Sequence, residues 1–220
     1  MNALALPLLL AWGASPAGEG VHRFNYASEN FSIALPVAWH EIDAAVLAQM
    51  PAALPRDLAS SPEIKFNHAF RPSGKAGSPE GAESSGGAES GYPWVGITLT
   101  KDEVTDGKFA NTNRVYGSVD ELIQKWQPPA LGATPPKARM SAMFYDKPRH
   151  VLWAVSLSRY SDLGDFRTIS AAYITRFGTV QVHCCSKAAE YEEYRPVCRE
   201  ILESVTIDPR VALTAGPAGK

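Results

Sequence analysis

The sequence has no excess of positive charge, and this absence excludes one large class of partner. Lys and Arg number 21 and Asp and Glu number 23 in the 220 residues, so the formal net charge is -2. No block of basic residues occurs anywhere in the chain. A nucleic-acid-binding protein needs clustered cations to displace the counterions of the phosphate backbone. We therefore expect no nucleic-acid partner.

Motifs of the common catalytic sites are also missing. No G-x-S-x-G sequence occurs, so a serine hydrolase of the usual α/β type is not indicated. The five histidines, at positions 22, 40, 68, 150 and 183, form no H-E-x-x-H pair of a metalloprotease. His40 and Glu41 are interpreted as a surface pair. We predict no catalytic residue and no cofactor.

Long apolar runs are absent except at the N-terminus. Residues 3–12 are apolar, and small residues at 13–17 follow before the first charge at Glu19. This pattern is typical of a secretory signal, with Ser15 and Ala17 at the cleavage positions, although the usual Lys or Arg before the apolar run is missing. The alternative is a buried N-terminal segment. We expect a signal peptide over 1–17, a periplasmic or secreted protein, and no transmembrane segment in the mature chain.

The rest of the chain has the composition of one globular domain. We predict a single domain over 18–208, and a flexible tail over 209–220 because the tail is small and polar. Residues 71–91 are rich in Gly, Ser, Pro, Ala and Glu, with no large apolar side chain after the first two positions. Such a segment cannot recover the entropy of ordering, so a mobile loop inside the domain is predicted there.

Strands and helices are indicated by their hydrophobic periods. Alternating or apolar runs predict strands at 24–26, 31–35, 64–70, 92–100, 149–157, 167–176 and 179–185. A capping box at Ser118–Glu121 begins a helix that ends before Pro128. A closing helix over 192–203 is predicted, with its regular part beginning near Tyr194 so that Pro196 lies in the first turn. The fold class is α+β: an antiparallel sheet of about six strands covered by helices.

The run F-S-I-A-L-P-V-A-W at 31–39, the Gly-terminated hairpin before V-Q-V-H-C at 180–184, and the closing Y-R-P-V-C-R-E-I-L-E-S-V-T-I at 194–207 carry a family resemblance. They resemble the PsbP-like superfamily, which includes the photosystem II extrinsic P protein, a nuclear Ran-release factor and many exported bacterial proteins. The resemblance implies an α-β-α sandwich and a binding or assembly role. It implies no active-site residue, because the family shares none.

The three cysteines, at 184, 185 and 198, are the one local cluster of residues that could bind a metal or form a disulfide. A zinc or copper site of His183, Cys185 and Cys198 is disfavoured, because strand alternation points His183 and Cys185 away from the closing helix. Cys184 shares its strand face with Val180 and Val182, toward that helix. In an oxidising compartment we therefore expect a Cys184–Cys198 disulfide with Cys185 free. A Cys185–Cys198 bridge is the alternative.

Tyr92 and Trp94 follow the predicted loop and are the aromatic residues expected at a contact surface. We predict a non-catalytic exported binding or assembly-accessory module, whose partner is another envelope protein or a small ligand. The alternative is a hydrolase-like enzyme whose site is assembled from residues distant in sequence.

Overall fold

The computed structural model describes residues 20–53, 66–73, 93–101, 109, 115–128, 137–160 and 164–213. The predicted signal peptide lies outside these residues, as do the predicted loop from residue 74 onward and the last seven residues of the predicted tail.

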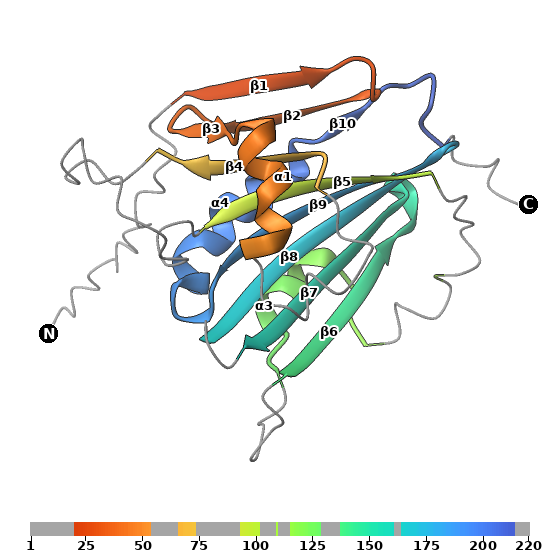
Figure 1. Ribbon diagram of the computed structural model, residues 1–220. Helices are drawn as coiled ribbons and strands as arrows, with labels where there is room; N and C mark the ends of the chain where they lie inside the picture. Colours follow the sequence, from red (N-terminus) through yellow and green to blue (C-terminus); the bar gives the residue numbers. More distant parts are fainter. Residues whose placement is uncertain are drawn as a thin grey trace, which may run out of the picture.

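Two antiparallel sheets contain the described strands (Figure 1). The larger sheet has seven strands, in the order β3 (Trp39–Glu41), β4 (His68–Pro72), β5 (Trp94–Thr100), β9 (Gly178–Lys187), β8 (Gly164–Thr175), β7 (Val151–Tyr160) and β6 (Lys137–Asp146). The smaller sheet has the order β1 (Val21–Tyr26), β2 (Phe31–Pro36) and β10 (Thr206–Ile207). The α+β class is therefore confirmed, and the predicted strands around 24–26 and 31–35 form a separate small sheet.

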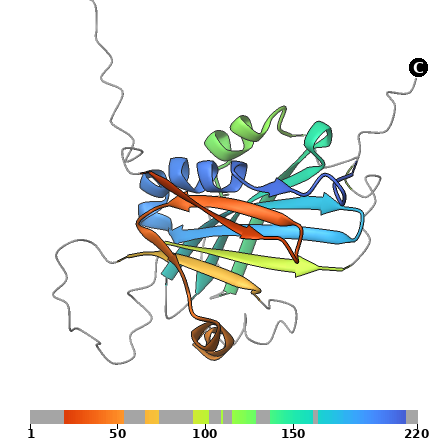
Figure 2. The ribbon, with the colours of Figure 1, turned by 90° about the horizontal axis from the view of Figure 1, so that it is seen from above.

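Helices lie on both sides of the large sheet, as Figure 2 shows. Helices α3 (Val119–Lys125) and α4 (Tyr191–Glu203) lie on one side together with the small sheet, and α1 (Ala44–Ala53) lies on the other. Short 3-10 helices, η3 (Lys147–Arg149) and η4 (Ala188–Glu190), precede β7 and α4. This arrangement is the predicted layering of helix, sheet and helix.

The main core fills the space between the large sheet and the α3, α4 and β2 layer. Strand alternation points one set of apolar side chains toward these elements. They form one buried cluster, which includes Ile33, Leu35, Val95, Ile97, Leu122, Val155, Ile169, Val182, Ile201 and Leu202. Each such side chain stabilises the fold by roughly 1.5–3 kcal/mol relative to exposure. We call this side of the large sheet the inner face.

Helix α3 begins as the sequence predicts. The Ser118 Oγ atom accepts a hydrogen bond from the Glu121 backbone N–H at 3.1 Å. The Glu121 carboxylate accepts one from the Gly117 N–H at 2.8 Å, one residue before the position expected in a capping box. The helix ends at Lys125, ahead of Pro128.

Helix α4 begins earlier than predicted, at Tyr191, so Pro196 lies inside the helix and not in its first turn. Pro196 has no N–H to donate to the preceding turn, which costs the helix one hydrogen bond. Burial of Tyr191, Cys198 and Leu202 against the large sheet offsets that cost.

The predicted hairpin between β8 and β9 is present, and glycine is required at its end. Gly178 has φ +137°, a conformation that residues with a side chain rarely adopt. A Cβ atom at this position would also lie 1.8 Å from the Thr100 carbonyl oxygen of the neighbouring β5 end.

The first residues of the predicted tail are held against this hairpin. The Arg176 N–H donates to the Val211 carbonyl, and Thr175 and Ala212 form an isolated antiparallel bridge. Residues 211 and 212, in the segment predicted as a tail, are therefore hydrogen-bonded or bridged to the end of β8.

Candidate functional site

The side of the large sheet that faces away from α3 and α4 carries polar side chains at its centre. They come from β5, β7, β8 and β9 and lie next to one another in the strand register. The residues are Thr98, Ser156, Thr168, Ser170, Gln181 and His183, and we call them the polar face. Thr98 and Ser156 are buried, whereas the other four are half-buried.

Two aromatic rings stand beside the polar face. Phe66 precedes β4 and Trp94 begins β5, and their ring centres are 5.0 Å apart at an interplanar angle of 77°. The Phe66 ring also meets the His183 imidazole edge-on, with the centres 6.4 Å apart. Both Phe66 and Trp94 are half-buried, so part of each side chain is accessible to a partner.

Gly96 lets these rings lie on the sheet. A Cβ atom at Gly96 would be 2.4 Å from Cζ3 of Trp94 and 2.7 Å from Cδ1 of Phe66. Contacts this short do not occur, so the missing side chain at Gly96 supplies the space that both rings occupy. This glycine is the sequence signal of a close approach within a strand.

A serine and a histidine face each other on the polar face. The Ser170 hydroxyl lies 2.9 Å from Nδ1 of His183, and the two residues are directly paired across β8 and β9. A hydroxyl beside an imidazole is the minimal arrangement from which an activated nucleophile is built. This pair was not predicted from the sequence, because the two residues belong to no motif.

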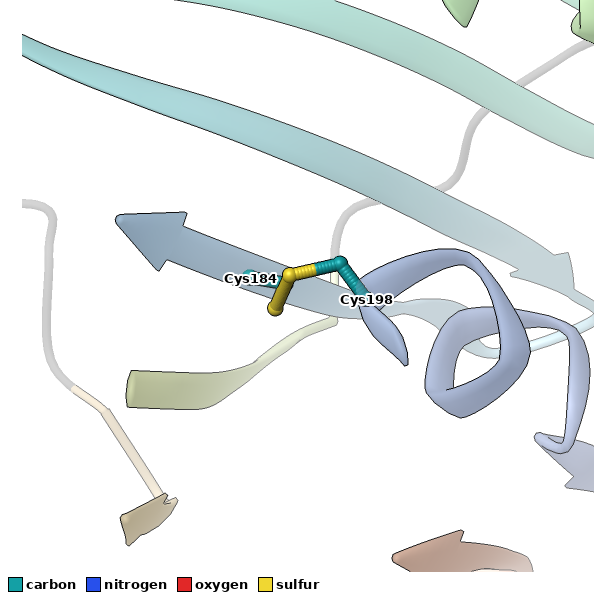
Figure 3. The surroundings of a disulfide bond; sticks show 2 residues. All are labelled: Cys184 and Cys198. Carbon is teal, nitrogen blue, oxygen red and sulfur yellow. A yellow bond between two sulfur atoms is a disulfide. The ribbon is translucent and has the colours of Figure 1, made fainter. Parts of the chain in front are cut away.

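Cys184 and Cys198 form a disulfide that joins β9 to α4 (Figure 3), with the Cα atoms 5.6 Å apart. Cys185 is free and buried. It lies on the other side of the sheet, because neighbouring residues of a strand point to opposite faces. The disfavoured metal-ligand set of His183, Cys185 and Cys198 is accordingly divided between the two sides of β9.

The Cys185 thiol is poorly suited to act as a nucleophile. Burial raises its pKa to about 11, and a hydrogen bond with Thr168 opposes that shift only in part. A thiol is reactive as the thiolate, which such an environment disfavours.

Of the two residues predicted at a contact surface, Trp94 lies beside the polar face and Tyr92 lies outside the described residues. The sequence did not predict that Phe66 lies against Trp94, or that His183 lies against Phe66 and Ser170. The Gly96 position within an apolar strand was the only available hint.

A second polar cluster lies where the small sheet meets β3 and β4. The His68 imidazole is within hydrogen-bond distance of the carboxylates of Glu41, 27 positions away in the sequence, and Glu29, 39 positions away. Glu41 was interpreted as the surface partner of His40. In the structure His40 instead contacts Ser73 and Arg71.

Among the described residues, no group of three or more His, Cys, Asp or Glu side chains is arranged to hold a metal ion. In the same part of the chain, no helix combines the length and the apolar character needed to cross a membrane.

The fold and the polar face define an α+β sandwich protein with one disulfide between sheet and helix. No family model and no curated protein matches the chain. Among solved structures, it is similar to the cyanobacterial PsbP protein CyanoP from Synechocystis sp. PCC 6803. The TM-score is 0.47 and the identity 7%, over 90% of this chain and 95% of that protein. A likeness of this degree says nothing about function.

Proposed function

We propose that this protein is a non-catalytic exported binding or assembly-accessory module, whose partner is another envelope protein or a small ligand. The observation that carries the proposal is the pair of half-buried rings, Phe66 and Trp94, set over Gly96 beside the polar face. Partly exposed aromatic rings next to hydrogen-bonding side chains offer both contact area and orientation to a partner.

The disulfide supports the exported location. Disulfides such as Cys184–Cys198 form and persist in the periplasm or outside the cell, whereas thiols in the cytosol are kept reduced. The predicted signal peptide over 1–17 leads to the same location.

The test is capture of partners by the mature protein, from residue 18 onward, from an extract of its own envelope. Trp94→Ala should lose the captured protein or ligand, because it removes the larger of the two rings. Phe177→Ala is the matched control, since Phe177 is a 70% exposed aromatic residue in the β8–β9 turn. Equal capture by wild type and Trp94→Ala, with the variant still folded by circular dichroism, would refute the contact surface.

A hydrolase-like enzyme is the second candidate, and the Ser170–His183 pair is the observation that favours it. In such an enzyme Ser170 would attack the substrate carbonyl and His183 would accept the hydroxyl proton. A fluorophosphonate probe distinguishes the two candidates. Labelling of wild type that disappears in Ser170→Ala, and remains in Ser158→Ala, would establish the enzyme. No labelling of folded wild type leaves the binding module as the better account.

A further inference from the structure

The imidazole of His68, on β4, has a carboxylate at each of its two nitrogens. Nε2 lies 2.6 Å from Glu29, in the turn between β1 and β2, and Nδ1 lies 2.8 Å from Glu41, on β3. The Tyr26 ring of β1 covers the imidazole, with the ring centres 3.9 Å apart. The His68 side chain is only 16% exposed, so water competes weakly for these two contacts.

Both contacts can be hydrogen bonds at the same time only when the imidazole is protonated. A carboxylate accepts and does not donate, so two carboxylates require two N–H groups on the ring. Neutral imidazole has one N–H and one lone pair, and the lone pair would then face a carboxylate oxygen at hydrogen-bond distance. Loss of the proton from His68 therefore breaks one of the two contacts.

The contact to Glu29 is the one whose loss would free a backbone segment from β4. Glu41 belongs to β3, which is paired with β4 through its backbone, so its carboxylate stays near His68 in either state. Glu29 belongs to the turn of another sheet, and its backbone N–H donates only to Tyr26 within that turn. The turn is also held by the Asp208 N–H, which donates to the Asn30 carbonyl, but neither of these backbone hydrogen bonds is to β4.

We propose that His68 is a pH-dependent tie between the two sheets, which holds the β1–β2 turn to β4 while the imidazole is protonated and releases it when the proton is lost. Imidazole is the side chain that changes charge between about pH 5 and pH 8. A periplasmic or secreted protein is exposed to this range more directly than a cytosolic one.

The other groups that face His68 do not titrate in that range. Burial, and then the negative charges of Glu41 and Glu29, raise the pKa of the Tyr26 phenol far above its usual value, so it stays neutral. Phe31 of β2 and the cross-strand neighbour Ile97 of β5 carry no charge. His40 and Arg71 point to the opposite side of the β3–β4 pair, by strand alternation.

The sign of the effect follows from the proton count. The protonated imidazole holds both carboxylates and the neutral imidazole holds only one, so the tie weakens when the proton is lost. Release would loosen contacts that the turn helps to maintain, such as the edge-on packing of Phe24 on Phe70 at 4.8 Å.

The test is amide hydrogen exchange followed by NMR. At each pH, protection is the exchange rate of an unstructured peptide divided by the rate measured in the protein. Between about pH 5.5 and about pH 8, protection of β1 and β2 should fall roughly five- to tenfold, and protection of β8 should not change. Glu29→Gln should abolish the fall, because an amide can accept from imidazolium and donate to imidazole. His68→Gln should show low protection at both pH values.

His40→Gln is the matched control, since it removes a neighbouring histidine outside the tie and should retain the fall. A wild type with no fall would overturn the proposal. So would the same fall in both Glu29→Gln and His68→Gln, which would assign the pH dependence to other groups. If either variant does not fold, the other one decides, because each removes the titrating contact from a different element.

Discussion

The guanidinium carbon of Arg167 lies 3.7 Å from the ring centre of Tyr191, and this contact joins β8 to the first turn of α4. The Trp126 ring lies 5.3 Å from the same carbon, and the Trp126 carbonyl accepts a hydrogen bond from Arg167 at 3.1 Å. Arg167 is only 9% exposed, and its burial lowers the pKa of the guanidinium. One buried cation therefore connects the end of α3, the start of α4 and the large sheet.

Replacement of Arg167 with Ala should lower the free energy of unfolding by about 2–4 kcal/mol, because it removes the stacking on two rings and leaves the Trp126 carbonyl without its donor. Urea denaturation measures this change. Arg149→Ala is the control, since the Arg149 side chain is 63% exposed and its loss should change stability by less than about 0.5 kcal/mol. A similarly small effect of Arg167→Ala would mean that the cost of burying the charge cancels its contacts.

Gly96→Ala should displace Trp94 and Phe66, because the new methyl group would overlap both rings. We expect a loss of about 1–3 kcal/mol from the overlap and a changed tryptophan fluorescence spectrum. Gly20→Ala is the control, as its Cβ atom would meet only Val37 at 3.9 Å. An unchanged spectrum would show that the rings do not depend on the bare backbone at Gly96.

The sequence predicted the parts of the fold that have a local cause. Spacing within a few residues predicts the cap at Ser118, the β8–β9 hairpin and the face of the strand on which Cys184 lies. Strand β6 was missed, because K-A-R-M-S-A-M-F-Y-D has no regular alternation and follows proline-rich sequence. Its pairing with β7 over its full length is a tertiary effect that local propensity does not contain.

The polar clusters were missed for a related reason. The neighbours of His68 come from the β1–β2 turn and from β3, so only the register of two sheets brings them together. The sequence also did not predict how many strands the large sheet has, because β1 and β2 would have the same hydrophobic pattern in either sheet. The pairing of β2 with β10, near the other end of the chain, places β1 and β2 in the small sheet.

Replacement of residues 74–91 by a short Gly-Ser linker should leave the protein folded. The segment contains no large apolar side chain that could anchor it, and β4 and β5, which it connects, are paired neighbours. Since loop-closure entropy depends weakly on length, we expect the melting temperature to change by less than about 3 °C. A larger loss would show that the segment packs on the domain.

The state of the three cysteines can be checked by counting thiols in the unfolded, unreduced protein. With a Cys184–Cys198 bridge, wild type has one free thiol, Cys185→Ser has none and Cys184→Ser has two. Two free thiols in Cys185→Ser and none in Cys184→Ser would indicate a Cys185–Cys198 bridge. Two free thiols in both variants would exclude either bridge to Cys198.

The same variants separate the roles of the bridge and the free thiol. Cys184→Ser should lose about 3 kcal/mol of stability, because it opens the loop that ties α4 to β9. Cys185→Ser keeps the bridge and should lose less. In folded wild type, iodoacetamide should modify Cys185 far more slowly than in urea, since the residue is 8% exposed and burial raises the pKa of its thiol to about 11. Rapid modification of the folded protein would mean that β9 opens at this position and that Cys185 is available to a partner.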